Sequence, residues 1–134
     1  MEVEVSAKAI ARFAAAIGDT DRVYRDLGAA RAAGYPGIPL PPTYGVFLLD
    51  DRPDPHGNLA LLGIDLRKLL HAEQSFEYHA PVFAGDQLIL TDRVADRYLK
   101  KGGSLEFVVL DCEARKANGE LALTIRRVLA VRHP

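Results

Sequence analysis

An aspartate and a tyrosine five residues apart, Asp19 and Tyr24, are the first candidates for chemistry in this sequence. A carboxylate can act as a general acid or base, whereas a tyrosine, with a reference pKa of about 10, donates hydrogen bonds at neutral pH and is a poor base. The turn after Gly18 also has a structural explanation, because aspartate often forms local hydrogen bonds in such turns. A role of Asp19 in proton transfer and a role in the turn therefore both stay open.

Two histidines, His71 and His79, lie in or beside the first strand-like stretch. His79 alternates with Phe76 and Tyr78, so we expect it on the solvent face. Cys112 is the only cysteine, and its pattern indicates a small buried side chain. No spacing of His, Asp and Glu is typical of a metal site, and no glycine-rich loop follows a strand to hold a phosphate. We expect neither a metal nor a nucleotide cofactor.

The composition of the 134 residues is that of one ordinary globular domain, with 49% hydrophobic and 26% charged residues. Seventeen basic residues are scattered among 18 acidic ones, which argues against a nucleic-acid partner. No apolar run reaches the roughly 20 residues that a membrane span needs, and the first residues do not resemble a signal peptide. These features predict a cytoplasmic protein that does not enter a membrane.

Two helices are expected near the N-terminus. Apolar residues recur at helical spacing after Ser6, a favourable N-cap, and Gly18 follows as a stop, which predicts a helix over residues 6–17. A shorter amphipathic helix is expected over residues 26–33, with Asp26 as its cap. The polar turn with Asp19 and Tyr24 joins them.

A loop and a third helix are expected next. Residues 34–43 contain too many prolines and glycines for a regular element. Residues 43–49 are apolar almost all round, which predicts a helix buried inside the domain. Residues 50–58, with two prolines and His56, read as an exposed loop.

The second half of the chain changes to the period of two that is typical of strands. Four strands are expected, at residues 73–80, 88–99, 105–115 and 121–132, with glycine-containing hairpin turns between the last three. Helices followed by an antiparallel meander predict one α+β domain over residues 1–134, whose sheet wraps a central apolar helix. Because such a sheet leaves unpaired edges, we also expect a dimer.

Two long segments resemble the MaoC-like dehydratases, residues 16–24 and residues 62–86. Four shorter runs are similar to the N-terminal dehydratase domain of that family: Gly37 to Thr43, His71 to Gln74, Tyr78 to Pro81 and Ala84 to Asp86. The resemblance implies a hot-dog fold and a substrate held as a thioester on coenzyme A or acyl carrier protein. It also implies reversible loss of water from an R-3-hydroxyacyl thioester by an Asp and a His in the pattern Asp-x-x-x-x-His.

This sequence departs from that pattern at two positions. Asp19 matches the catalytic aspartate, but Tyr24 stands where the histidine is expected. Pro42 stands where active members provide a glycine amide to polarise the thioester carbonyl, and proline has no N–H. The resemblance therefore assigns Asp19 to a degenerate catalytic motif, and Tyr24, Pro42 and Thr43 to acyl-thioester binding.

Three functions follow from this comparison. The first is an accessory, acyl-binding subunit of an R-specific dehydratase or hydratase, paired with a hot-dog chain that supplies the Asp and His. The second is a self-sufficient homodimeric hydratase in which Asp19 works with His71 or His79. The third is an acyl-thioester binding module without enzymatic activity. A thioesterase is disfavoured, because residues 43–49 contain no carboxylate to guide water.

Overall fold

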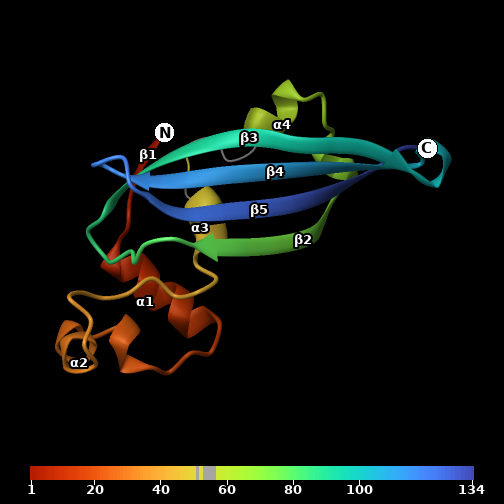
Figure 1. Ribbon diagram of the computed structural model, residues 1–134. Helices are drawn as coiled ribbons and strands as arrows, with labels where there is room; N and C mark the ends of the chain where they lie inside the picture. The colour runs from red at the N-terminus through yellow and green to blue at the C-terminus, as the bar shows by residue number, and fades with distance from the viewer. Residues whose placement is uncertain (51, 53–56) are drawn as a thin grey trace.

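The computed structural model describes residues 1–50, 52 and 57–134 (Figure 1). Its helices and strands are, in chain order, β1 (Glu2–Glu4), α1 (Ala7–Ala16), α2 (Leu27–Ala32), α3 (Gly45–Asp50), α4 (Gly57–Leu61), β2 (Leu69–Tyr78), β3 (Gln87–Lys100), β4 (Leu105–Lys116) and β5 (Leu121–Arg132). Most of the loop expected over residues 50–58, His56 included, lies outside the described residues. The α+β class is confirmed.

One antiparallel sheet holds all five strands in the order β1-β3-β4-β5-β2. The expected meander is confirmed for β3, β4 and β5 but is wrong for β2, which pairs with β5 at the far side of the sheet. The link over residues 79–86 is longer than most hairpin loops and contains Pro81, so it crosses to the other side instead of folding β2 back onto β3. The three residues of β1 were too few to show a period.

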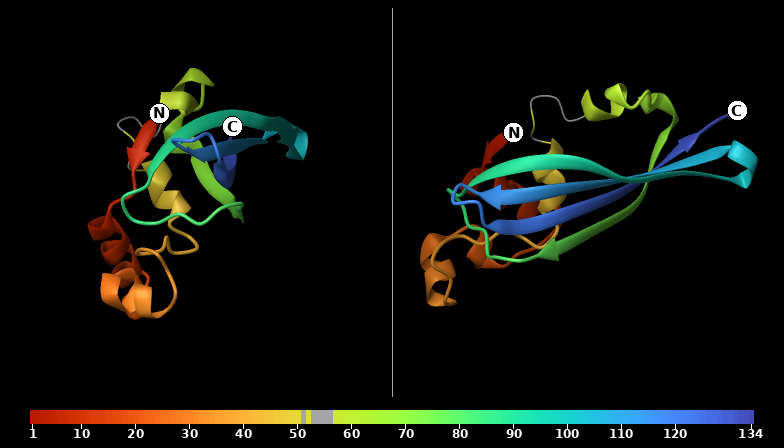
Figure 2. Two further views of the ribbon diagram at one scale, coloured as in Figure 1. Left: turned by 60° about the vertical axis from the view of Figure 1, so that its left-hand side comes forward. Right: turned by 45° about the horizontal axis from the view of Figure 1, so that its top comes forward.

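The sheet curves around α3, as the sequence predicts for the apolar helix (Figure 2). Tyr44, just before this helix, and Leu48 and Leu49 within it are buried in the main core. Gly45 allows the close approach, because a Cβ atom at this position would lie 2.7 Å from the ring of Phe76 on β2. The glycine at position 45 therefore lets α3 pack closely against β2.

The two N-terminal helices begin at the predicted caps. The Ser6 hydroxyl accepts a hydrogen bond from the amide of Ala9, and the Asp26 carboxylate accepts one from Gly28. These helices lie at one end of the sheet, where α1 packs close to the strands and α2 lies farther out (Figure 1). The turn between them, which contains Asp19 and Tyr24, therefore also lies at this end of the sheet.

Two further expectations can be compared with the described residues. Cys112 is buried, and burial with the nearby charge of Asp92 raises the pKa of its thiol to about 12. Among the helices formed by the described residues, none is long and apolar enough to cross a membrane.

Candidate functional site

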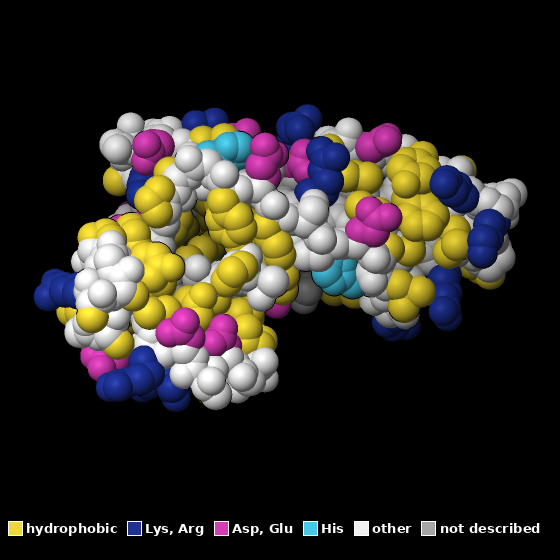
Figure 3. Space-filling view, turned by 60° about the horizontal axis from the view of Figure 1, so that its bottom comes forward, with side chains coloured by type: hydrophobic (Ala, Val, Ile, Leu, Met, Phe, Trp, Pro, Cys, Tyr) yellow, Lys and Arg dark blue, Asp and Glu magenta, His cyan; other side chains and the backbone are white. Residues whose placement is uncertain are grey.

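An open cavity of about 440 Å³ lies between the helical end of the molecule and the end of β2. Its walls come from a 3-10 turn at Arg22–Tyr24, from the loop over residues 34–43, and from the link over residues 79–86. On the face drawn in Figure 3, hydrophobic side chains surround a hollow beside the helical region. Segments that are far apart in the sequence thus form one cavity, which we call the tyrosine cavity.

Three tyrosines give the cavity its phenol groups: Tyr24, Tyr35 and Tyr78. The Tyr78 hydroxyl donates a hydrogen bond to the backbone carbonyl of Pro42. Partial burial, with a contribution from Tyr24, raises the pKa of Tyr78 to about 12. The phenol is therefore protonated at neutral pH and acts as a hydrogen-bond donor.

The structure brings Tyr24 and Pro42 to the same cavity, and their role in substrate binding stays a prediction. Burial raises the pKa of Tyr24, and the charge of Asp19 raises it further, with smaller contributions from Tyr35 and Asp21. A neutral tyrosine cannot accept a proton as a histidine does. Pro42 offers the cavity a carbonyl that Tyr78 already occupies, and it has no amide hydrogen to donate.

Asp19 lies next to this cavity without lining it. Its carboxylate accepts a hydrogen bond of 2.9 Å from the amide of Asp21, which is the local turn contact that its surroundings allow. Asp19 is nevertheless close enough to Tyr24 to raise its pKa. The catalytic role of Asp19 stays a prediction. So does the binding role of Thr43, which is exposed in the turn before α3 and does not line the cavity.

The two histidines lie in different places. His79 is exposed as expected, but it does not point away from the site: β2 ends at Tyr78, the chain turns there, and His79 and Tyr78 line the same cavity. The ring Nε2 of His79 lies 3.3 Å from the hydroxyl of Thr124. His71 lines a separate cavity beside α3 and α4, so the structure does not bring it to Asp19.

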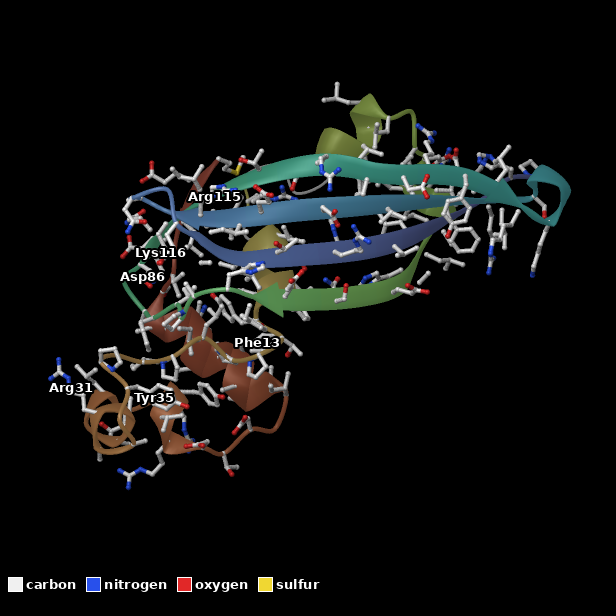
Figure 4. The ribbon with its side chains drawn as sticks, viewed as in Figure 1. Phe13, Arg31, Tyr35, Asp86, Arg115 and Lys116 are labelled. Atoms are coloured by element: carbon white, nitrogen blue, oxygen red, sulfur yellow. The ribbon has the colours of Figure 1, made fainter. Side chains whose placement is uncertain are left out.

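Tyr35 is a cavity residue that sequence reasoning did not single out. It follows α2 inside the loop over residues 34–43 and lies between α2 and α1 in Figure 4. Its only signal in the sequence was an aromatic residue in a segment of prolines and glycines. Within the part of the chain that the structure describes, no three side chains of His, Cys, Asp or Glu form a group that could hold a metal ion.

The rest of the lining is apolar, with Leu40, Val82 and Phe83 among its members. An apolar cleft with a few phenol donors is suited to hold an acyl chain and to bind a carbonyl oxygen. Among the described side chains that line this cavity, His79 is the one imidazole.

Comparison with known proteins identifies the family and the fold of this chain. Residues 1–125 match the family described as FAS1-like, dehydratase domain region. The chain belongs to this family. A UPF0336 protein of Saccharopolyspora erythraea is 35% identical to it over 129 residues, which cover 96% of this chain and 81% of that protein.

Solved structures share the fold of this FAS1-like dehydratase region. The C-terminally truncated HadBC complex, a (3R)-hydroxyacyl-ACP dehydratase of Mycobacterium tuberculosis, matches with a TM-score of 0.81 and 22% identity, over 97% of this chain and 90% of that chain. The ChsH1-ChsH2 complex of the same organism matches with a TM-score of 0.74 and 25% identity, over 98% of this chain and 85% of that chain. MaoC-like dehydratases also have this fold, so the hot-dog expectation is confirmed.

Proposed function

We propose that this chain is the accessory, acyl-binding subunit of an R-specific 3-hydroxyacyl-thioester dehydratase or enoyl-CoA hydratase. The observation that carries the proposal is Tyr24, a neutral phenol at the position where the family's pattern has its catalytic histidine. Removal of a proton beside a thioester carbonyl, while hydroxide leaves, needs both a base and an acid. Asp19 with Tyr24 supplies no such pair.

The tyrosine cavity is suited to the binding half of this task. Its apolar walls would take the acyl chain, and the hydroxyl of Tyr24 or Tyr35 would donate a hydrogen bond to the thioester carbonyl. Acyl-CoA and acyl carrier protein present the same thioester, so either carrier fits this role. Pro42 has no N–H to donate to the thioester carbonyl, whereas an active site would use a backbone amide at this position. Losing one such donor typically lowers the rate about 100 to 1,000 fold.

A catalytic hot-dog partner is expected at the edge of the sheet. β2 ends the strand order, so one side of its ten residues has no strand beside it among the described residues. An unpaired edge of this length is a template for another strand. The fold relatives HadBC and ChsH1-ChsH2 are complexes of two different chains, which supports pairing with a second hot-dog chain over pairing with itself.

Co-expression with hot-dog chains that contain an intact Asp-x-x-x-x-His motif tests the proposal. We expect the purified chain alone to hydrate crotonyl-CoA at background rate, and the complex to hydrate it rapidly. Alanine in place of the partner's aspartate should abolish that activity, whereas Asp19→Ala should leave it nearly unchanged. Rapid hydration by the chain alone, with no hot-dog partner bound, would overturn the proposal.

One observation favours a second candidate, a self-sufficient homodimer. His79 lines the tyrosine cavity together with Tyr24, so an imidazole is available where the substrate would bind. In that case His79→Gln would abolish crotonyl-CoA hydration by the chain alone. If the chain binds acyl-CoA in calorimetry but neither the chain nor any complex with a hot-dog partner is active, the protein is a binding module instead.

A further inference from the structure

The inner face of the sheet carries a second cluster of polar side chains, away from the tyrosine cavity. The buried apolar residues form two groups, one around α3 and one beneath α4 that includes Leu59, Val108 and Leu129. Charged side chains lie between the groups, and two of them are Arg52 and Asp92. Charged groups at such a depth are costly unless each has a partner.

Arg52 and Asp92 satisfy each other. Arg52 is only 8% exposed, and it donates one hydrogen bond to the carbonyl of Leu49 and another to the carboxylate of Asp92. Burial opposes ionisation of Asp92, but the hydrogen bond and charge of Arg52 outweigh it and hold the pKa of this carboxyl below its usual range. Arg52 is therefore the main partner of the Asp92 carboxylate, which also interacts with the Cys112 thiol and with the charge of Arg127.

Arg127 is a second cation of this cluster, and it lines the same cavity as Asp92. It lies on β5 between Gln74 of β2 and Leu110 of β4, on the face that the helices cover. Among the described residues it forms no hydrogen bond and no ion pair. Burial lowers the pKa of Arg127 and the charge of Arg52 lowers it further, whereas the carboxylates of Asp92 and Asp50 act in the opposite direction. An anion beside this guanidinium would be bound favourably.

Two cavities meet at Arg127. One, of about 170 Å³, opens toward β2, and the other, of about 210 Å³, lies between α4 and β3. We call the second cavity the α4 slot; its apolar lining is Leu61, Leu62, Val94 and Leu110. A hydrogen bond of 3.1 Å from Arg97 of β3 to the carbonyl of Leu62 holds the end of α4 against the strand.

The mouth of the α4 slot exposes hydrocarbon to solvent. Leu61 is 87% exposed and Val94 is 41% exposed, although both belong to the lining. Besides Arg127 and Asp92, the polar lining contains Arg93, which is ion-paired with Asp111. The slot therefore combines an apolar passage with one guanidinium whose N–H groups form no hydrogen bond to a described residue, although the charge of Asp92 lies in the same lining.

We propose that the α4 slot is a second ligand site, which binds an alkyl carboxylate with the carboxylate on Arg127 and the hydrocarbon along Leu61, Leu62 and Val94. This site shares no lining residue with the tyrosine cavity, so the proposal goes beyond the proposed function. A cavity of about 150 Å³ holds benzene, so the α4 slot has room for part of a medium-length chain, whose remainder would lie across Leu61. A thioester or an alcohol offers Arg127 no charge.

Calorimetric titration of the purified chain with decanoate and with 1-decanol tests this proposal. We expect decanoate to bind and decanol to bind at least tenfold more weakly, because only decanoate forms a charge-assisted hydrogen bond. Arg127→Gln should weaken decanoate at least tenfold and leave decanol unchanged. Arg132→Gln is the matched control, since Arg132 is exposed at the end of the same strand.

A second variant keeps the test decisive if Arg127→Gln does not fold. Leu61→Asp places a negative charge at the exposed mouth, where no core contact is lost, and should weaken decanoate by repulsion. Leu99→Asp, on an exposed residue of β3, is its control and should have no effect. If the protein binds no decanoate, or if decanoate binds equally to the folded Leu61→Asp variant and the wild type, the proposal is wrong. The second result would place decanoate elsewhere, for example in the tyrosine cavity.

Discussion

The tyrosine cavity and the α4 slot are built on one sheet but differ in what they hold. Loops and a strand end form the tyrosine cavity, where the pKa values of Tyr24 and Tyr78 are shifted upward, so these two phenols stay neutral. Strands and α4 form the slot, whose lining includes the charged Asp92 and Arg127, and Asp92 is ion-paired with the buried Arg52. Neutral donors on loops suit a carbonyl that needs no proton transfer, whereas a fixed charge on a strand suits a charged ligand.

The largest effect is expected from giving the tyrosine cavity the acid–base group that it lacks. Tyr24→His restores the spacing of five residues from Asp19, and Pro42→Gly restores a backbone amide. We expect each change alone to do little, since each leaves the other defect in place. The double variant should hydrate crotonyl-CoA faster than the parent, because general acid–base help is typically worth about 100 to 10,000 fold. Absorbance of the enoyl thioester measures the rate.

The control for this experiment is a third substitution. Asp19→Ala in the double variant should return the rate to that of the parent, because the new histidine would then have no carboxylate partner. If the double variant folds and stays as inactive as the parent, the placement of Asp19, Tyr24 and Pro42 around one reaction centre is wrong. The tyrosine cavity and the α4 slot would then differ only in the ligands that they bind.

The sequence predicted the helices and strands of the fold better than it predicted which strands pair with each other. Caps and apolar spacing gave α1, α2 and α3, and the period of two gave the four long strands. A period tells which face of a strand is buried but not which strand lies beside it, so the pairing of β2 with β5 was missed. The central helix and the curved sheet followed from composition and order.

The sites could be predicted only where a motif was present. The resemblance led to Tyr24 and Pro42, which the structure places in one cavity. Tyr35 and His79 reach that cavity through loop conformations that no local pattern encodes. The position of Arg127 on the inner face could not be predicted for another reason. Arg127 follows Arg126 directly, so the alternation of charged and apolar residues does not tell which of the two arginines points inward.

The buried ion pair of Arg52 and Asp92 is expected to contribute to the stability of the fold. Asp92→Asn leaves Arg52 buried without a counter-charge, and breaking a buried pair typically costs about 3 to 5 kcal/mol. Because Asp92 is not fully buried, we expect the lower end of this range in urea unfolding at neutral pH. Asp96→Asn, at an exposed position of the same strand, is the control and should change the free energy of unfolding by less than about 0.5 kcal/mol.

The pH dependence of stability gives an independent reading of the same pair. The folded protein lowers the pKa of Asp92, so folding favours the ionised carboxylate. Its contribution is therefore present above the unfolded value of about 3.9 and is lost as the pH falls through the lower, folded value. Asp92→Asn should remove this part of the acid dependence. An unchanged acid profile would show that Arg52 does not depend on Asp92 for its charge.

The smallest effect is expected at the neutral cavity. Tyr78→Phe removes the hydroxyl that donates to the Pro42 carbonyl, and a partly exposed carbonyl can bind water instead. We therefore expect a loss of about 0.5 to 1 kcal/mol in the free energy of unfolding, the usual net value of a neutral hydrogen bond. Acyl-CoA binding should weaken more than this if the bond holds the loop over residues 34–43 in the shape that receives the acyl chain. Tyr98→Phe, on an exposed tyrosine far along β3, is the control. Equal affinity for crotonyl-CoA in calorimetry of the parent and Tyr78→Phe would mean that the cavity does not need this contact, and that its donors are Tyr24 and Tyr35.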